Sequence, residues 1–306
     1  MKSNILLLLS AVAIVSASCL RDPSVVTHHH KSLTRRNREE GSVPVSTFGY
    51  TALKGPLDWY GLNKATNGAC AMGTMQSPIN IDTDIGLAME KVVLKIPDVS
   101  SAKFENLGTN VEVVVNGTLL VGRKEYKLQQ FHFHTPSEHR FFEEFYPMEV
   151  HFVLQASGKK IYKKILFEMS TNWTFINDYL DSTIAVVGFV VQLCTSSESD
   201  SFLDDVFANI GDIETPGTFT ETGPLTFGAL EEHLHHNKIF QYSGSLTTPP
   251  CSEGVNWLIS TEPLQLDVNT YNKVKSILKF NSRYTQNNLG GTNLLEVAAA
   301  ELATSA

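Results

Sequence analysis

The chain has 306 residues, a net charge of -8 at pH 7 and a hydrophobic content of 42%. This length allows one large domain with a substantial buried core, and the composition is that of a globular protein. The acidic balance argues against a nucleic-acid partner and favours solubility. Composition excludes little more, so the chemistry has to come from motifs.

Residues 1–18 have the layout of a secretory signal peptide. Met1-Lys2 precedes an apolar run at 5–15, and small residues follow at 16–18. The run is too short for a membrane span, so the mature protein is expected to be secreted without a transmembrane anchor. A lipid-modified Cys19 is the alternative, but the residues before it lack the leucine usual in bacterial lipoprotein signals.

Three further segments follow the signal peptide. Residues 19–45 are rich in Arg, Lys, His, Ser and Thr without apolar periodicity, which predicts a disordered leader or propeptide. The triplet His28, His29 and His30 lies there and is expected to have no specific role. No repeat or linker interrupts residues 46–290, which predicts a single domain, and 291–306 is expected to be a C-terminal tail. Cleavage of the leader at Arg35-Arg36 is left open.

The domain is predicted to be mainly β. Residues 48–82 look loop-like, with aromatic residues that would pin this segment onto the domain. Beyond them, β-branched and aromatic runs alternate with turn residues, and the doubly apolar run at 184–191 predicts a covered central strand. Helices are few, with candidates at 201–210 and 267–280. Strands are predicted at 91–96, 111–116, 118–123, 125–134, 148–156, 161–168, 184–193 and 256–260.

Export gives the cysteines the option of pairing, because an oxidising compartment permits disulfides. Cys70 and Cys251 lie in loop-like segments and could meet. Cys194 ends a long apolar strand and is expected to be a buried thiol. Two sequons make Asn116 and Asn172 candidates for glycosylation in a eukaryotic host.

A metal site is predicted around the segment 130–139. In a strand, His132 and His134 share one face while Phe131 and Phe133 point into the core. His151 lies in a second alternating segment that a short connection could bring alongside the first. Three histidines without a fourth protein ligand are the arrangement expected of a catalytic zinc.

Two residues strengthen this hypothesis. Gln130 and Glu149 lie on the histidine faces and could accept the second ring N–H of a ligand, which fixes its tautomer. The alternative is that His132 and His134 are polar positions on a solvated sheet face. The presence of Gln130 and Glu149 on the same faces argues against this alternative.

The remaining histidines of the domain are weaker candidates for metal ligands. His233, His235 and His236 have no such acceptors and are expected on a solvated edge or at a weak surface site. His139, which lies beside Glu138, is expected to be a structural hydrogen-bonding residue.

A second polar pair suggests how a metal hydroxide would be oriented. A threonine hydroxyl that donates to a buried carboxylate can only accept a hydrogen bond from the hydroxide, whose lone pair then faces the substrate. Glu138 and Thr247 could form this pair.

From about residue 48 to 288, the chain resembles the α-class carbonic anhydrases, of the secreted type. The motifs that carry the resemblance are, in chain order, Gln76-Ser-Pro-Ile-Asn-Ile, Gln130-Phe-His-Phe-His, Ser137-Glu-His, Glu149-Val-His, Ser245-Leu-Thr-Thr-Pro-Pro and Asn281-Ser-Arg.

The resemblance implies a function and a fold. It implies Zn²⁺ as the cofactor, carbon dioxide and bicarbonate as substrates, and attack of zinc-bound hydroxide on carbon dioxide. It also implies a large, twisted and mostly antiparallel central sheet with short surface helices, which makes the fold α+β but mainly β.

Residue roles follow from the same resemblance. His132, His134 and His151 would hold zinc, with Gln130 and Glu149 as their acceptors. Thr247, oriented by Glu138, and Thr248 would be catalytic. The apolar wall for carbon dioxide would be Val153, Val186, Leu246 and Trp257, and a disulfide would join Cys70 to Cys251.

The chain departs from the family pattern at four positions. Thr109 stands where fast members have a histidine that shuttles protons, and threonine cannot do this near neutral pH. Leu107 and Glu112 stand where uncharged polar residues are expected, and Phe48 replaces a usual tryptophan. Proton transfer is therefore expected to be slow and rescued by small buffers. A substitute route through Glu112, or through Tyr50 and water, is left open.

Two other functions stay in view. One is a catalytically silent binding module on the same fold, which would typically have lost a zinc histidine. The other is a zinc hydrolase of small esters. The sequence does not indicate the oligomeric state or the physiological role.

Overall fold

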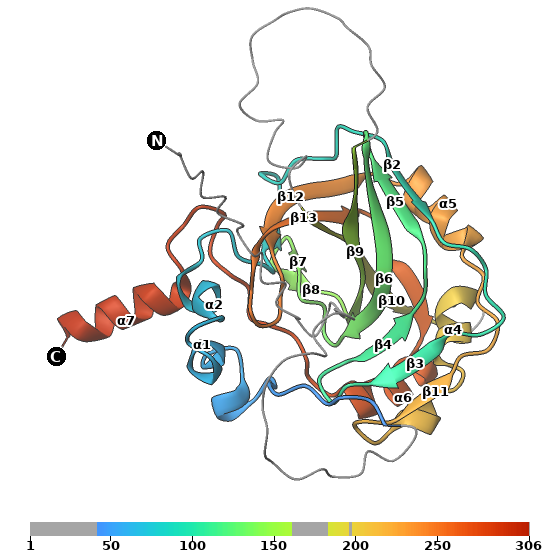
Figure 1. The fold of residues 1–306 in the computed structure, drawn as a ribbon, viewed down its shortest axis with the longest axis horizontal. Coiled ribbons are helices and arrows are strands. Elements are labelled where there is room, and N and C mark those ends of the chain that lie inside the picture. The colour runs from blue at the N-terminus through green and yellow to red at the C-terminus, as the bar shows by residue number, and fades with distance from the viewer. Residues whose placement is uncertain (1–41, 161–182, 196–197, 306) are drawn as a thin grey trace, which may run out of the picture.

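The computed structural model describes residues 42–160, 183–195 and 198–305. An eleven-stranded, mostly antiparallel sheet organises the fold (Figure 1). Eight strands follow one another in the order β11-β3-β4-β6-β9-β10-β13-β12; β5 pairs with β6 and with β2, and β14 pairs with β10. The strands are β2 (Val92–Lys95), β3 (Lys103–Asn106), β4 (Val111–Val114), β5 (Thr118–Val121), β6 (Lys124–His134), β9 (Met148–Lys160), β10 (Ile184–Cys194), β11 (Phe219–Glu221), β12 (Ile239–Ser245), β13 (Glu253–Ser260) and β14 (Leu264–Asp267).

Short elements surround this sheet. A three-stranded sheet is formed by β1 (Asn80–Ile81), β7 (Arg140–Phe141) and β8 (Glu144–Phe145). The helices are η1 (Ala52–Lys54), α1 (Trp59–Leu62), α2 (Gly68–Met72), α4 (Ser201–Phe207), η2 (Ile210–Ile213), α5 (Gly228–His236), α6 (Val268–Leu278) and α7 (Leu294–Thr304). The expected mainly β fold, with a large antiparallel sheet and short helices, is confirmed.

Strand alternation places the core on one face of β6. Phe131 and Phe133 are fully buried in the large hydrophobic cluster. Phe131 stacks on Phe152 of β9 at 4.8 Å between ring centroids, and Phe133 lies 4.6 Å from Phe207 of α4. The histidines that alternate with them must therefore face the other side of the sheet.

The run at 184–191 forms β10, which is covered on both faces as expected. Val187 and Phe189 belong to the large cluster, whereas Val186 and Val190 belong to a second cluster on the opposite face. β10 pairs with β9 on one side and with β13 and β14 on the other. Apolar residues on both faces are what a strand in this central position requires.

Both predicted helices are present, and one has a clear start signal. Asp267 caps α6, because its carboxylate accepts hydrogen bonds from the backbone N–H of Asn269 and Thr270, both at 2.9 Å. The helix predicted at 201–210 ends earlier, as α4, and continues as the 3-10 turn η2.

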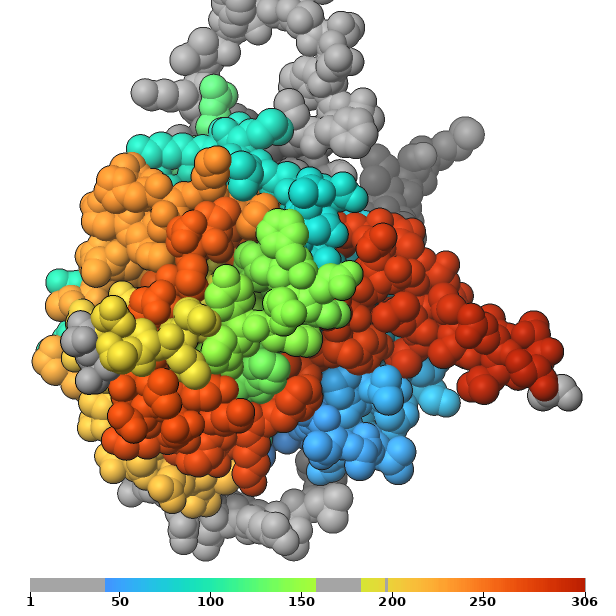
Figure 2. Space-filling view, turned by 180° about the vertical axis from the view of Figure 1, so that it is seen from behind, coloured from blue at the N-terminus to red at the C-terminus, as the bar shows by residue number. Residues whose placement is uncertain are grey.

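Several predicted elements differ in the structure. The loop-like segment 48–82 contains three short helices, and the tail contains α7, which projects from the body (Figures 1 and 2). Asn293 starts α7 by accepting a hydrogen bond from Leu295 N. The strand predicted at 148–156 extends to residue 160, while the one predicted at 161–168 lies outside the described residues.

The aromatic residues of the N-terminal segment do pin it to the domain. Trp59 is fully buried, and its ring meets Phe48 and Tyr50 edge-on at centroid distances of 5.5 and 5.7 Å. Its indole N–H donates to the carbonyl oxygens of Gly49 and Lys54. Burial of Phe48 and Trp59 in one cluster with Cys251, against which Tyr50 packs partly buried, thus anchors a segment that has little regular structure.

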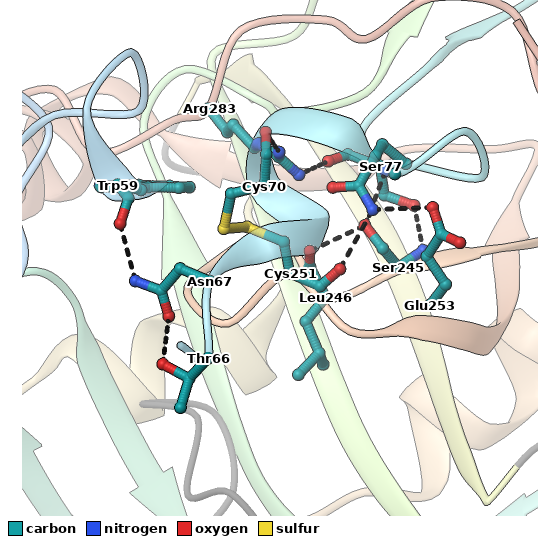
Figure 3. The surroundings of a disulfide bond; sticks show 12 residues. Trp59, Thr66, Asn67, Cys70, Ser77, Ser245, Leu246, Cys251, Glu253 and Arg283 are labelled. Atoms are coloured by element: carbon teal, nitrogen blue, oxygen red, sulfur yellow. Dashed lines mark hydrogen bonds between the residues drawn. A yellow bond between two sulfur atoms is a disulfide. The ribbon is translucent and has the colours of Figure 1, made fainter. Parts of the chain in front are cut away.

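A disulfide joins Cys70 of α2 to Cys251, across 181 positions of sequence (Figure 3). This confirms the expected pairing. The expectation of a buried Cys194 is wrong, since this thiol is partly exposed. Cys194 is the last residue of β10, and its backbone partner is Asp267 at the end of the sheet, where solvent reaches it.

No helix within the described ranges has the length and apolar character required to cross a bilayer.

We predict that the double variant Cys70→Ser/Cys251→Ser unfolds more easily than the wild type. A cross-link across 181 positions restricts the unfolded chain, and its loss costs on the order of 5 kcal/mol in the chain-entropy treatment. Urea unfolding without reductant measures the change, with Cys194→Ser as the control that removes an unpaired thiol. Equal stability of the double variant and the control would contradict this role.

Candidate metal centre

Two neighbouring strands bring the three predicted histidines together. In the antiparallel pairing of β6 with β9, His132 lies directly opposite His151, and His134 is two residues further along β6. All three side chains are buried, and their ring centroids are 4.7 to 5.4 Å apart. One nitrogen from each ring lies within 4.8 Å of the others.

Each ring is oriented by an oxygen that accepts its second N–H. His132 Nδ1 donates to Gln130 Oε1 at 2.9 Å, and His151 Nε2 donates to Glu149 Oε1 at 2.8 Å. His134 Nδ1 donates to the backbone oxygen of Asn281 at 2.8 Å. These acceptors fix the tautomer of each ring. The nitrogen lone pair therefore lies on Nε2 in His132 and His134 and on Nδ1 in His151.

Sequence reasoning found two of these acceptors and missed the third. Gln130 and Glu149 were detectable because their residue types and positions suit the role. The Asn281 carbonyl belongs to the backbone, so no residue type reveals it. The signal available was the motif Asn281-Ser-Arg, to which no role was given.

The residues present fit a zinc ion. His134 Nε2 is buried without a hydrogen-bond partner among the described residues, which is costly unless a ligand takes its lone pair. Burial is the main cause that lowers the pKa of His134 to about 4 and that also lowers the pKa of His132 and His151. Neutral imidazoles at pH 7 can bind a metal without first losing protons. Three nitrogen ligands match a tetrahedral zinc with one open position.

A buried carboxylate supports this arrangement from behind. Glu149 Oε2 accepts from the backbone N–H of Glu138 and His139, and Glu149 Oε1 accepts from His139 Nδ1 as well as from His151. His139, Glu149 and His151 could also be grouped as metal ligands, but these hydrogen bonds already occupy the atoms concerned. His139 is therefore structural, as expected.

A chain of hydrogen bonds connects His139 to β12 and to the segment before β1. His139 Nε2 accepts from the Tyr242 hydroxyl at 2.7 Å, and this hydroxyl is 2.8 Å from Ser77 Oγ. Ser77 Oγ accepts from Ser245 N, and Ser245 Oγ accepts from Ser77 N. Tyr242 and Ser77 were given no role from sequence, although Ser77 lies within the Gln76-Ser-Pro motif.

Glu138 lies between the histidines and the C-terminal segment. Its Oε2 is 3.5 Å from His134 Nε2, and its Oε1 accepts from the backbone N–H of Arg283 at 2.9 Å. Burial raises the pKa of Glu138 to about 7, while His151 and the hydroxyl of Thr247 oppose this rise. The Thr247 hydroxyl thus interacts with the Glu138 carboxylate. Among the described residues, Glu138 Oε2 itself has no hydrogen-bond partner.

The disulfide holds the loop that carries Thr247 and Thr248. The backbone N–H of Cys251 donates to the Thr248 carbonyl at 2.8 Å. The buried guanidinium of Arg283 donates to the carbonyl oxygens of Ser77 and Cys70 at 2.8 and 3.3 Å (Figure 3). The disulfide, the threonine loop and the segment around Arg283 are therefore connected beside the metal centre.

The four residues expected to form an apolar wall lie in one hydrophobic cluster. Val153, Val186, Leu246 and Trp257 are all at most 4% exposed. The Trp257 ring centroid is 4.8 Å from that of His151, and its indole N–H donates to Ser245 O. The cluster thus borders the histidines.

The position of the missing shuttle histidine is tightly packed. Thr109 is 8% exposed, and its hydroxyl is 2.7 Å from Ser46 Oγ. Its backbone oxygen accepts from the side-chain amide of Asn281, whose own carbonyl orients His134. Thr109 is therefore two hydrogen bonds away from a metal-binding ring. Among the other departures, Glu112 lies opposite His132, and Leu107 and Phe48 are buried.

The histidine group near the C-terminal half lies on helix α5 rather than on a strand. His233 Nε2 is 3.0 Å from the Glu262 carbonyl oxygen, and His236 pairs with Glu232 at 3.0 Å on an exposed surface. Leu230 and Leu234, four residues apart, are the buried positions of this helix, while His235 and His236 are exposed. The triplet His28, His29 and His30 and the sequon at Asn172 lie outside the described residues.

Comparisons with known proteins agree with this geometry. The sequence profile of the eukaryotic-type carbonic anhydrases matches residues 54–294. Alpha carbonic anhydrase 5 of Arabidopsis thaliana is 31% identical over 223 residues, which cover 68% of each chain. A fungal alpha carbonic anhydrase structure from Aspergillus oryzae is 48% identical with a TM-score of 0.72, covering 83% of this chain and 99% of the other. A Thermovibrio ammonificans alpha carbonic anhydrase, solved with the inhibitor sulfanilamide, is 29% identical with a TM-score of 0.61, covering 78% and 95%.

We predict that Gln130→Ala weakens zinc binding by roughly 10- to 100-fold, because His132 loses the acceptor that orients its ring. Gln129→Ala is the matched control, since the Gln129 side chain donates to the carbonyl of Lys127 instead. Competition with a chromogenic chelator measures both affinities. An equal loss of affinity in the two variants would show that the hydrogen bond to His132 is not what matters.

Proposed function

Because the chain belongs to the family of eukaryotic-type carbonic anhydrases, we propose that it catalyses the reversible hydration of carbon dioxide to bicarbonate and a proton. The observation that carries the proposal is the set of three buried histidines whose ligand nitrogens lie within 4.8 Å of one another, while an acceptor fixes the orientation of each ring. Zinc held by three histidines, for which carbonic anhydrase is itself the standard example, lowers the pKa of a bound water and supplies a nucleophile near neutral pH.

Thr247 and Glu138 would set the direction of attack. Arg283 N holds the carboxylate of Glu138, and the Thr247 hydroxyl interacts with that carboxylate. A hydroxyl that donates its only proton to a carboxylate can act towards a reactant only as an acceptor. Thr247 would therefore accept the proton of the attacking oxygen, whose lone pair then faces carbon dioxide.

The wall formed by Val153, Val186, Leu246 and Trp257 suits the substrate. Carbon dioxide is small and carries no net dipole, so an apolar surface binds it without a desolvation cost. Bicarbonate is charged and gains less from this surface, which favours its release. Thr248, on the loop held by the disulfide, would hold bicarbonate before it leaves.

Two other functions make different demands. A catalytically silent binding module would not need three buried histidines with clustered ligand nitrogens and fixed tautomers, so the site supports an enzyme instead. Hydrolysis of small esters would use the same nucleophile as a side activity. Carbon dioxide hydration is therefore the principal proposal.

We also propose that the protein is secreted, after removal of residues 1–18 and with 19–45 as a leader. The Cys70–Cys251 disulfide supports this, because such bonds persist in oxidising compartments. Residues 46–290 would be the catalytic domain and 291–306 an appended tail. No nucleic-acid partner is proposed.

Proton release is proposed to be the slow step. Thr109 cannot carry a proton near neutral pH, and its hydroxyl is engaged with Ser46. A small buffer that enters the site would replace the absent shuttle. Glu112, which lies opposite His132, or Tyr50 through water are the candidates within the chain for a partial substitute.

The direct test of the proposed activity is stopped-flow carbon dioxide hydration by the zinc-loaded protein. We expect hydration that a chelator abolishes, that added zinc restores and that sulfanilamide inhibits. His134→Ala should lose it, because a buried ligand is removed. A zinc-loaded protein without hydration activity would favour the silent binding module, and ester hydrolysis alone would favour the hydrolase.

The proton-transfer proposal has its own test. We expect kcat of the wild type to rise with imidazole concentration, whereas Thr109→His should raise kcat at low buffer and reduce this dependence. The ratio kcat/KM should stay the same, since it reports the attack on carbon dioxide and not the later proton transfer. Thr109→Gln, similar in size but not titratable, is the matched control. Turnover independent of imidazole in the wild type would exclude a slow proton step.

A further inference from the structure

A cavity of about 770 Å³ lies beside the metal centre, and apart from Gln130 and Glu112 its lining has no part in the proposed activity. Its volume lies within the roughly 300–1,000 Å³ usual for ligand sites. Two lining residues locate it: Gln130 bonds to His132, and Glu112 lies opposite His132 on β4. The cavity therefore opens on the sheet face that carries the histidines.

The sequon Asn116-Gly117-Thr118 forms part of the cavity's lip, between β4 and β5. Asn116 and Thr118 are exposed, and among the described residues neither side chain has a hydrogen-bond partner. A bulky glycan is compatible with the folded protein only where its asparagine lies at the surface, as Asn116 does.

Gly117, the middle residue of the sequon, packs closely against neighbouring strands. A Cβ on Gly117 would lie 2.9 Å from the Lys95 carbonyl oxygen and 3.0 Å from Ile96 Cγ1. The carbonyl of Gly117 also accepts from Leu128 N at 2.9 Å. Close packing thus explains the glycine as a structural residue, while the exposed asparagine and threonine take no part in that packing.

We propose that Asn116 carries an N-linked glycan whose first sugars lie in this cavity and cover the approach to the metal centre from β4 and β5. In the attachment step, the Asn116 Nδ2 bonds to the anomeric carbon of a lipid-pyrophosphate-linked oligosaccharide. The bond from that carbon to the pyrophosphate breaks, and the amide nitrogen loses one proton. The eukaryotic secretory pathway supplies this class of donor.

The cavity lining suits a sugar. Sugar rings present apolar faces and a rim of hydroxyl groups, so they need both apolar and hydrogen-bonding contacts. The lining offers Ile96, Pro97, Val114 and Leu128 as apolar contacts, and Lys127, Gln129, Thr118 and the ion pair of Lys95 with Glu231 as polar ones. Thr118 lies between Lys95 and Lys127 in the β2-β5-β6 register, so these three side chains share one face.

The glycan would limit what reaches the site by size. Carbon dioxide and bicarbonate are small enough to pass, whereas a molecule with a bulky extension would need the volume that the sugars fill. This consequence rests on the proposed function, because it takes the histidine site to be the active site. The modification itself does not depend on that function.

The modification is tested on the full chain secreted from a eukaryotic host. Peptide mapping after enzymatic release in ¹⁸O-water should show conversion of Asn116 to labelled Asp. Thr118→Ser keeps the sequon and should keep the glycan, whereas Thr118→Ala and Asn116→Gln should lose it. Asn172→Gln separates the second sequon. An unmodified Asn116 in the wild type and in Thr118→Ser would overturn the proposal.

The position of the sugars is tested without reference to activity. Acylation of Lys127 by an amine-reactive ester should be about tenfold slower in the wild type than in Thr118→Ala, because sugars in the cavity exclude the reagent. Lys273, exposed on α6, should react equally in both. Equal rates at Lys127 would show that the glycan points away from the cavity.

The effect on access uses two sulfonamides. Loss of the glycan should raise the affinity of a sulfonamide with a bulky aromatic extension by about five- to tenfold and leave that of sulfanilamide unchanged. An unchanged ratio of the two affinities would overturn the size limit. If neither compound binds in either form, the proposed function fails, while the mapping and acylation results still decide the glycan.

Discussion

One buried carboxylate, Glu149, holds the metal centre together. Burial by itself raises the pKa of Glu149, but its electrostatic interactions and hydrogen bonds with His139 and His151 keep that pKa well below its usual range. The ionised group accepts four N–H donors, two from the backbone after Ser137 and one from each of these histidines. Charge-assisted hydrogen bonds in a dry interior are strong, so this group fixes both a ligand ring and the loop that carries Glu138.

The same constraint reaches distant parts of the chain. Tyr242 of β12 links His139 to Ser77, so a residue before β1 is connected to a metal-binding ring by hydrogen bonds alone. On the opposite side, Asn281 binds His134 through its carbonyl and Thr109 through its amide. The position of His134 thus depends on a segment 147 residues away, and His151 is connected through Glu149 and His139 to Tyr242, so the site draws on most of the domain.

Sequence reasoning reached the features that depend on residue type and strand period. Alternation separated the core phenylalanines of β6 from the histidines, and Gln130 and Glu149 were recognisable because their side chains do the work. It could not reach the backbone carbonyl of Asn281, since any residue has one. It did not predict α5, whose buried Leu230 and Leu234 are four residues apart, and it did not predict β3 and β14.

The disulfide divides the chain into a covalent ring and two free ends. Residues 70–251 form the ring, which contains all three histidines, Glu138, Glu149 and Thr247. Asn281 and Arg283 lie outside it, yet one orients His134 and the other holds Glu138. The metal centre thus combines residues of a covalently closed ring with hydrogen bonds from Asn281 and Arg283, which lie outside that ring. Proteolytic removal of the C-terminal end that carries Asn281 and Arg283 would leave the ring intact, but the metal centre would lose both residues. The covalent ring and the alignment of the site therefore depend on different stretches of the chain.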